Sequence, residues 1–197
     1  ITVYPDVVSN FNGTPNEGCS PLSVNFTNQS FGAATYFWNF GDGTEAFQEN
    51  PNHVFVNMSD TVETYNVRLI SQSGFGCTDT SYREIKVFPV PNISVALDGI
   101  EGCFPADVSF ANYSNGADSF TWSYGDGNTS TNGDSVHAHT YVNSGVDIET
   151  YTVSVTGTSA YGCVGTGQID VDIIPQIIAS VNPPVGGCSP YVAEFEN

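Results

Sequence analysis

The side chains of this sequence that could do chemistry are five cysteines, three histidines and the aspartates of two Gly-Asp-Gly runs. The glycines beside Asp42 and Asp126 permit positive φ, and an Asp side chain can bond its own downstream backbone, so each run predicts a tight turn. Asp and Asn oxygens crowd these turns, which makes Asp42 and Asp126 weak calcium candidates, although the EF-hand spacing is missing. His53 and His139 stand at matched positions, which favours a structural hydrogen bond over catalysis.

The histidines and carboxylates form no catalytic pattern. No Ser-His-Asp, Cys-His or paired-carboxylate arrangement stands out, and no Gly-rich phosphate loop precedes a helix. His137 and His139 would share one face of a strand and could hold a metal, but the corresponding earlier segment lacks the first of them. We therefore expect no catalytic residue, no cofactor and, apart from a weak calcium contact, no metal.

The same landmarks recur along the chain at an interval of about 85 residues. The segment GCSPLSVNFTN from Gly18 recurs as GCFPADVSFAN from Gly102 and as GCSPYVAEFEN from Gly187. The prolines at positions 89, 91 and 175 make the connections short and stiff, which predicts domains stacked end to end. The expected parts are the last strand of a preceding repeat (1–5), two full repeats (6–89 and 90–175) and the start of a further, truncated repeat (176–197).

The cysteines follow this repeat. One pair in each full repeat predicts two disulfides within domains, Cys19–Cys77 and Cys103–Cys163, and Cys188 then pairs with a partner beyond the chain end. A metal site is the competing interpretation, but no CxxC and no Cys/His pair at ligand spacing occurs. Disulfides indicate an oxidising, extracytoplasmic location.

The elements that must position these residues are strands. The chain is dense in Val, Thr, Tyr and Phe and interrupted by turn residues, which is an all-β composition. Apolar and polar residues alternate, which buries one face of each strand and indicates antiparallel sheets. A central Trp on an aromatic strand suits an immunoglobulin-like sandwich, so the expected fold is tandem antiparallel β-sandwiches. The alternating segments are 22–26, 36–40, 65–69, 85–87, 108–110, 120–124, 151–155 and 169–173.

Charge and hydropathy exclude several classes of protein. The chain of 197 residues has 21 Asp+Glu and 3 Lys+Arg, a net charge of −18. So few basic residues cannot neutralise nucleic-acid phosphates or dock on an anionic membrane. No apolar run approaches the length of a spanning helix, so direct membrane insertion is not expected. Hydrophobic residues make up 40% of the chain, enough to build a folded core.

The run YFWNFGDGT at 36–44, followed by PNHVF at 51–55 and TYNV at 64–67, resembles the PKD (polycystic kidney disease) domain. That family's pattern is W-D-F-G-D-G, then P-x-H-x-Y and Y-x-V. Asn39 replaces its first Asp, and the second repeat departs further at Ser123 and Tyr124. The resemblance implies an immunoglobulin-like sandwich used outside the cell as a spacer, adhesion or protein-contact module.

The added cysteines, the surface rich in Asn and Thr and the tandem array further resemble the large secreted surface proteins of Bacteroidota. These include the gliding-motility adhesins of the type IX secretion route. The segments beginning at Asp60 and Asp134 resemble the O-glycosylation motif of that phylum, which would place the modification on Thr61 and Ser135.

Three functions remain after this reasoning. The first is a non-catalytic structural or adhesive segment of a cell-surface or secreted protein, a semi-rigid rod whose partners are neighbouring repeats of the same chain. The second is a module that binds surface glycans or proteins through a platform of Phe31, Phe47 and Phe75, although we expect these rings to pack under loops. The third is an accessory spacer of a secreted hydrolase.

Overall fold

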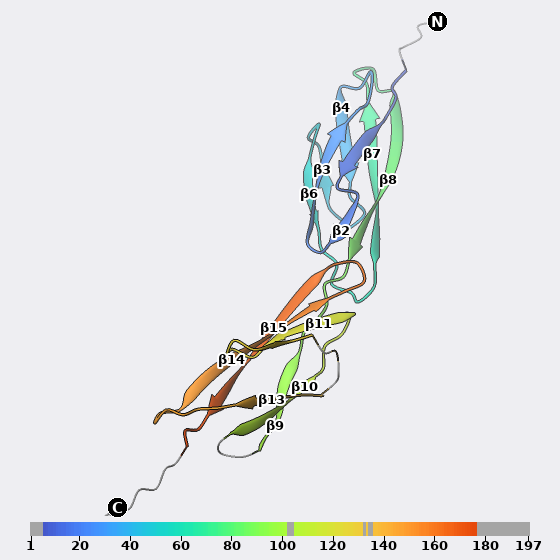
Figure 1. Cartoon of the computed structure of the whole chain (residues 1–197). Helices are drawn as coiled ribbons and strands as arrows, with labels where there is room; N and C mark the ends of the chain where they lie inside the picture. The colour runs from blue at the N-terminus through green and yellow to red at the C-terminus, as the bar shows by residue number, and fades with distance from the viewer. Residues whose placement is uncertain (1–5, 102–104, 132, 134–135, 177–197) are drawn as a thin grey trace, which may run out of the picture.

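A computed structural model of the chain describes residues 6–101, 105–131, 133 and 136–176. These residues form two β domains placed end to end, the first built from strands β1–β8 and the second from β9–β15 (Figure 1). The described residues contain no helix long and apolar enough to cross a membrane. The all-β, tandem architecture predicted from the sequence is therefore confirmed.

The first domain is a sandwich of a three-stranded and a five-stranded sheet. The smaller sheet has the order β1 (Phe11–Thr14), β3 (Leu22–Asn28), β6 (Asn52–Phe55). The larger has the order β2 (Glu17–Cys19), β8 (Thr78–Phe88), β7 (Glu63–Gln72), β4 (Thr35–Asn39), β5 (Glu45–Ala46). The strand β2 pairs with β8 in parallel, whereas the other pairs of this domain are antiparallel.

The second domain repeats this plan. One sheet has the order β13 (Val136–Tyr141), β10 (Ala106–Asn112), β9 (Val95–Glu101). The other has the order β12 (Thr129–Ser130), β11 (Ser119–Ser123), β14 (Glu149–Thr158), β15 (Val164–Ile173). The strand pairs of this domain are antiparallel.

Each domain has its own core, formed by the alternating apolar residues of both sheets. Trp38 and Trp122 are fully buried at the centres of these cores. The Trp38 ring packs edge-on against Phe11 at a centroid distance of 4.9 Å, and Phe26 lies 5.5 Å away. Aromatic pairs of this kind contribute about 0.5–1.5 kcal/mol each beyond the area that they bury. Because each core closes within its own domain, the relative placement of the domains depends on the junction between them.

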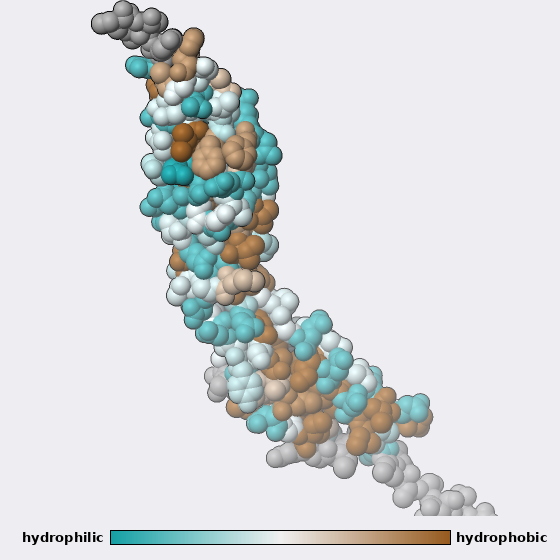
Figure 2. Space-filling model, turned by 180° about the vertical axis from the view of Figure 1, so that it is seen from behind, coloured by the Kyte–Doolittle hydropathy of each residue, from teal (hydrophilic) through white to brown (hydrophobic). Residues whose placement is uncertain are grey.

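The described residues form an elongated shape, with one domain following the other along its length (Figure 1, Figure 2). Apolar side chains are more frequent over the visible face of the second domain than over that of the first (Figure 2). Negative charge spread along such a shape keeps like domains soluble and opposes their collapse onto one another.

Candidate functional site

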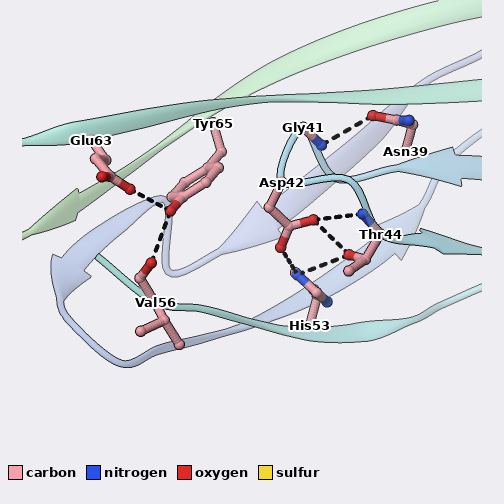
Figure 3. A network of polar contacts seen from close by, with 8 residues as sticks. All are labelled: Asn39, Gly41, Asp42, Thr44, His53, Val56, Glu63 and Tyr65. Atoms are coloured by element: carbon pink, nitrogen blue, oxygen red, sulfur yellow. Dashed lines mark hydrogen bonds and ion pairs between the residues drawn. The ribbon is translucent and has the colours of Figure 1, made fainter. Parts of the chain in front are cut away.

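Each Gly-Asp-Gly run forms a tight turn that binds a histidine of the opposite sheet. In the first domain Asp42 Oδ1 accepts the N–H of Thr44 at 3.0 Å and the Thr44 hydroxyl at 2.6 Å. Asp42 Oδ2 lies 2.6 Å from His53 Nε2 (Figure 3). Gly41 and Gly43 have φ of +83° and +90°, which only glycine adopts without strain. We call this arrangement the Asp–His clasp.

The clasp ties together the two sheets of the sandwich. Asp42 follows β4 of the five-stranded sheet, whereas His53 lies on β6 of the three-stranded sheet. The His53 ring stacks on Phe40 with centroids 4.1 Å apart, and its edge contacts Phe55 at 4.7 Å. Both phenylalanines are buried, so the core fixes the orientation of the imidazole that Asp42 binds.

The second domain contains the same clasp with different neighbours. Asp126 Oδ2 lies 2.7 Å from His139 Nε2, and Asp126 Oδ1 accepts the N–H of Asn128 at 3.0 Å. The His139 ring stacks on Tyr124 at 4.0 Å and meets Tyr141 edge-on at 4.7 Å. The structural role expected for His53 and His139 is therefore observed in both domains.

The electrostatics of the clasp favour an ionised carboxylate. Burial by itself would raise the pKa of Asp42, but the hydrogen bonds from Thr44 and His53 outweigh it and lower the pKa below the usual 3.8. In the same way, burial by itself would raise the pKa of Asp126, but the hydrogen bonds from His139 and Asn128 outweigh it and lower that pKa. Both aspartates thus stay charged through neutral pH.

The clasp lacks the geometry of a catalytic triad. A triad histidine uses one ring nitrogen for the nucleophile and the other for the acid. Here His53 Nε2 faces both Asp42, at 2.6 Å, and the Thr44 hydroxyl, at 3.4 Å. The Thr44 hydroxyl also donates to Asp42, and Asn128 replaces Thr44 in the second domain. The arrangement stabilises a turn rather than activating a nucleophile.

Asp42 and Asp126 are also the residues predicted to contact calcium weakly. Both oxygens of each carboxylate already accept protein hydrogen bonds or face a histidine. Within the described ranges, no group of three or more His, Cys, Asp or Glu residues converges as a metal site would require. Calcium at these turns stays a prediction.

A tyrosine on β7 closes the neighbouring loop of the first domain. The Tyr65 hydroxyl lies 2.5 Å from Glu63 Oε2 and 2.9 Å from the carbonyl of Val56 (Figure 3). Burial and the Glu63 carboxylate raise the pKa of Tyr65 to about 12, so the hydroxyl stays a donor. In the second domain, burial and Glu149 raise the pKa of Tyr151.

The disulfide of the described residues joins the two domains. It links Cys19, the last residue of β2, to Cys163, in the turn between β14 and β15, with the Cα atoms 5.5 Å apart. The β14–β15 hairpin of the second domain reaches the end of the first domain where β8 finishes (Figure 1). Cys77 is free and partly exposed. The predicted pairs Cys19–Cys77 and Cys103–Cys163 are therefore wrong, because Cys19 and Cys163 are bonded to each other and Cys77 is free.

Strand length explains why the pairing within a domain fails. Cys19 pairs in register with Phe88 at one end of β8, while Cys77 immediately precedes Thr78 at the other end. The strand has 11 residues and spans about 35 Å at about 3.3 Å per residue. A disulfide needs Cα atoms within about 7 Å. Repeat spacing alone showed that cysteines recur, but not that Cys19 and Cys77 lie at opposite ends of the first domain.

Aromatic and backbone contacts reinforce the disulfide. Phe88 of the first domain stacks on Tyr161 of the second, with centroids 4.5 Å apart and ring planes 8° from parallel. A cavity of about 430 Å³ lies beside the stack, and its walls come from both domains, including Met58, Asp60 and Asn115. The junction is thus a packed interface rather than a free linker.

The segment after Pro89 packs closely on glycines of the second domain. A Cβ added at Gly165 would lie 2.1 Å from the carbonyl oxygen of Pro91, and one at Gly157 would lie 2.3 Å from Ile93 Cδ1. Neither site has room for a side chain, so glycine at these two positions of β14 and β15 lets the linker lie against the hairpin. This contact holds the start of the second domain in one place.

The remaining predicted positions are the glycosylation sites, two cysteines and the outer segments of the chain. Thr61 is exposed, and its glycosylation stays a prediction. Cys103, Ser135 and Cys188 lie outside the described residues, as do the predicted segment 1–5 and all but the first residue of the predicted segment 176–197.

The three aromatics considered for a binding platform do not pack under loops as expected. Phe31, Phe47 and Phe75 are 75%, 72% and 65% exposed. They also occupy different places, because Phe47 packs on Phe37 of β4, at a centroid distance of 5.5 Å, whereas Phe75 lies in the turn between β7 and β8. The expectation that these rings are covered is wrong for all three.

A pair of asparagines was missed by the sequence reasoning. Asn57 is buried, and its side-chain amide donates to the carbonyls of Thr61 and Val87 at 2.7 and 2.8 Å. Asn143 does the same in the second domain, to Asp147 and Ile173 at 2.8 Å each. Their recurrence at matched positions was a signal that the repeat comparison could have used.

Comparison with protein families matches the PKD domain twice, over residues 3–87 and 89–173. Among solved structures, the PKD1 domain of the metalloprotease PrtV from Vibrio cholerae is 27% identical. The match covers 42% of this chain and 96% of that one, with a TM-score of 0.35. The PKD1 domain of Epp from Vibrio anguillarum is 26% identical, with coverages of 43% and 96% and a TM-score of 0.35. No curated protein matches the chain.

Proposed function

The chain belongs to the PKD-domain family, and from this premise we propose that it is a non-catalytic, semi-rigid rod segment of a secreted or cell-surface adhesin. The observation that carries the proposal is the junction, where the Cys19–Cys163 disulfide and the Phe88–Tyr161 stack join the domains end to end. A segment of this kind holds whatever lies beyond it at a fixed distance and direction.

The chemistry of the junction supports an extracellular setting. A disulfide between domains persists in oxidising compartments and is reduced in the cytosol. The net charge of −18 on an elongated surface opposes lateral association of copies. In its specific form, the proposal is a gliding-motility adhesin exported by the type IX route, with glycosylation at Thr61 and Ser135. The added cysteines, the surface rich in Asn and Thr and the tandem repeats favour this form. Neighbouring repeats are its expected partners.

Small-angle scattering tests the rod directly. The chain should give an elongated particle with a single stiff shape, and reduction of the disulfide should broaden its distance distribution because only the short linker and the stack remain. The double variant Cys19→Ser, Cys163→Ser should reproduce the reduced profile, and Cys77→Ser is the matched control that should leave it unchanged. A compact globule, or a profile indifferent to reduction, would contradict the proposal.

A second candidate function, glycan binding, rests on the exposed Phe47 and the half-buried Phe37 on which it packs. These rings border a groove of about 290 Å³ on the outer face of the five-stranded sheet, and the Arg68 guanidinium lies 5.9 Å from the Phe37 centroid. Exposed apolar patches of this kind mark interaction sites. The second domain has Thr121 and Thr131 at the matching positions, so the aromatic pair is not repeated there. A glycan array that is equally flat for the wild type and Phe47→Ala would remove this candidate.

A further inference from the structure

The turn that carries Cys77 has the same geometry as the turn that carries the bonded Cys163. In the first domain the N–H of Ser73 donates to the carbonyl of Cys77 at 2.9 Å, and the N–H of Cys77 donates to Ser73 Oγ at 3.2 Å. In the second domain the same two bonds join Ser159 and Cys163, at 2.9 and 3.2 Å. Cys77 is therefore presented as Cys163 is, but it has no disulfide partner among the described residues.

The surface beside Cys77 corresponds to the face of the second domain that the first domain covers. A bridge between Asn92 and Asn115 lies in the wall of the junction cavity, and the matching bridge in the first domain joins Val8 to Phe31. Val8 and Phe31 are 53% and 75% exposed, and Phe75 stands at the position of the stacking Tyr161. This end of the first domain thus exposes an apolar surface around the Cys77 thiol. The matching end of the second domain is covered by the first domain.

We infer that this end of the first domain docks the C-terminal end of another PKD-type domain, and that Cys77 forms a disulfide with that domain's cysteine at the Cys19 position. The occupant follows from continuity with the junction already described, which has the same turn and the same cysteine. In sequence, ITVYP at 1–5 also matches IKVFP at 85–89, so that Tyr4 aligns with Phe88. The inference rests on the proposed rod and extends it to a second covalent junction.

The rule that results is that each PKD repeat gives one cysteine to the repeat before it and one to the repeat after it. Disulfides would then run between successive domains, and none would lie within a domain. Formation of each bond converts two thiols to one disulfide and releases two protons and two electrons. A disulfide oxidant such as oxidised glutathione accepts them and becomes two thiols, so the step balances without any redox group in the protein.

The test extends the chain at its N-terminus with a second copy of residues 6–89 in place of residues 1–5. The added copy carries Cys77→Ser, so that only the original Cys77 remains and the added Cys19 has no partner within its own domain. The protein is folded in a glutathione redox buffer, alkylated and digested with trypsin without reduction. Peptides that remain linked are identified by mass spectrometry.

The inference predicts a link between the added Cys19 and the original Cys77 in most molecules, alongside the retained Cys19–Cys163 link. A matched variant with Cys77→Ser at the original position should leave the added Cys19 fully alkylated. An alkylated Cys19 in the added copy, with Cys19–Cys163 intact, would overturn the inference and leave the proposed rod standing. Loss of the Cys19–Cys163 link as well would count against both the inference and the rod.

Discussion

The two domains share a fold but build their N-terminal ends from different side chains. In the first domain Ser9 forms a polar network, in which its N–H donates to Asp79 at 2.7 Å and its hydroxyl lies 2.8 Å from that of Ser81. In the second domain Ile93 takes the place of Ser9, and Gly165 and Gly167 take the places of Asp79 and Ser81. Hydrogen bonds in one copy are thus replaced by close apolar packing in the other.

The same contrast extends to the cysteines and aromatic rings at these ends. The second domain's end is covered by the first domain, with Cys163 bonded and Tyr161 stacked. The first domain's end carries a free thiol at Cys77 within an exposed apolar surface. The end of the second domain is complementary to the neighbour that covers it, whereas the matching end of the first domain has the same turn and is exposed.

The largest expected effect comes from opening the occupied junction. The double variant Cys19→Ser, Cys163→Ser removes a cross-link that spans 144 residues, which the chain-entropy treatment values at about 5 kcal/mol. We expect a large fall in the free energy of unfolding measured with guanidinium. Cys77→Ser, at the matching position of the first domain, should change the midpoint very little, and an equal loss in both variants would erase the contrast between the two ends.

The next effect tests the close packing of the linker. Gly165→Ala places a Cβ 2.1 Å from the Pro91 carbonyl, so the linker or the hairpin must shift, at a cost of about 1–3 kcal/mol. Thermal unfolding of the second domain should therefore begin at a lower temperature. Gly74→Ala, in the corresponding hairpin of the first domain, has no atom within 4 Å of the new Cβ and serves as the control. Equal stability of the two variants would show that the linker is not tightly held.

The Asp–His clasp should stabilise both domains by a similar free energy, and this stabilisation should be lost in acid. Because hydrogen bonds lower the pKa of Asp42 in the folded state, its stabilisation is present above the usual value of 3.8 and is lost as the pH falls through the lower folded value. Asp42→Ala should cost about 1–2 kcal/mol at pH 7. Its difference from the wild type should shrink by pH 2, as measured by urea unfolding at each pH. Asp126→Ala should behave in the same way, and a pH-independent difference would argue against the clasp.

The smallest effect concerns the aromatic stack. Tyr161→Ala removes its contact with Phe88 and should cost about 0.5–1.5 kcal/mol, because the ring is partly exposed. Tyr161→Phe keeps the ring and should match the wild type in the same denaturant titration. If the two variants are equally stable, the stack contributes little and the disulfide alone holds the junction.

Local pattern predicted the fold well, because alternation of apolar residues is a property of each strand by itself. The buried residues Val24, Trp38 and Val67 lie where period two places them. The parallel pairing of β2 with β8 was not predicted, because a strand of three residues has too little pattern to reveal its partner. The Asp–His clasp was anticipated in part, as a turn and a structural histidine, but their mutual contact depends on how the sheets face one another.

The disulfide pairing could not be deduced in the same way. Two cysteines in each repeat allow pairing within a domain or between neighbours, and spacing is identical in both schemes. The decision depends on the length of β8 and on which end of the domain each cysteine occupies, which are three-dimensional facts. The exposure of Phe31 and Phe75 has the same origin, since these rings lie at a domain end rather than on a strand face.

The most direct test of this account is a disulfide map of the 197-residue chain itself. Its three basic residues, Arg68, Arg83 and Lys86, allow trypsin to place Cys19 in fragment 1–68, Cys77 in 69–83 and Cys163 in 87–197. Without reduction, fragment 1–68 should remain linked to 87–197, and 69–83 should be released with an alkylated cysteine. A link between 1–68 and 69–83 would show a disulfide within the first domain and would contradict the covalent junction.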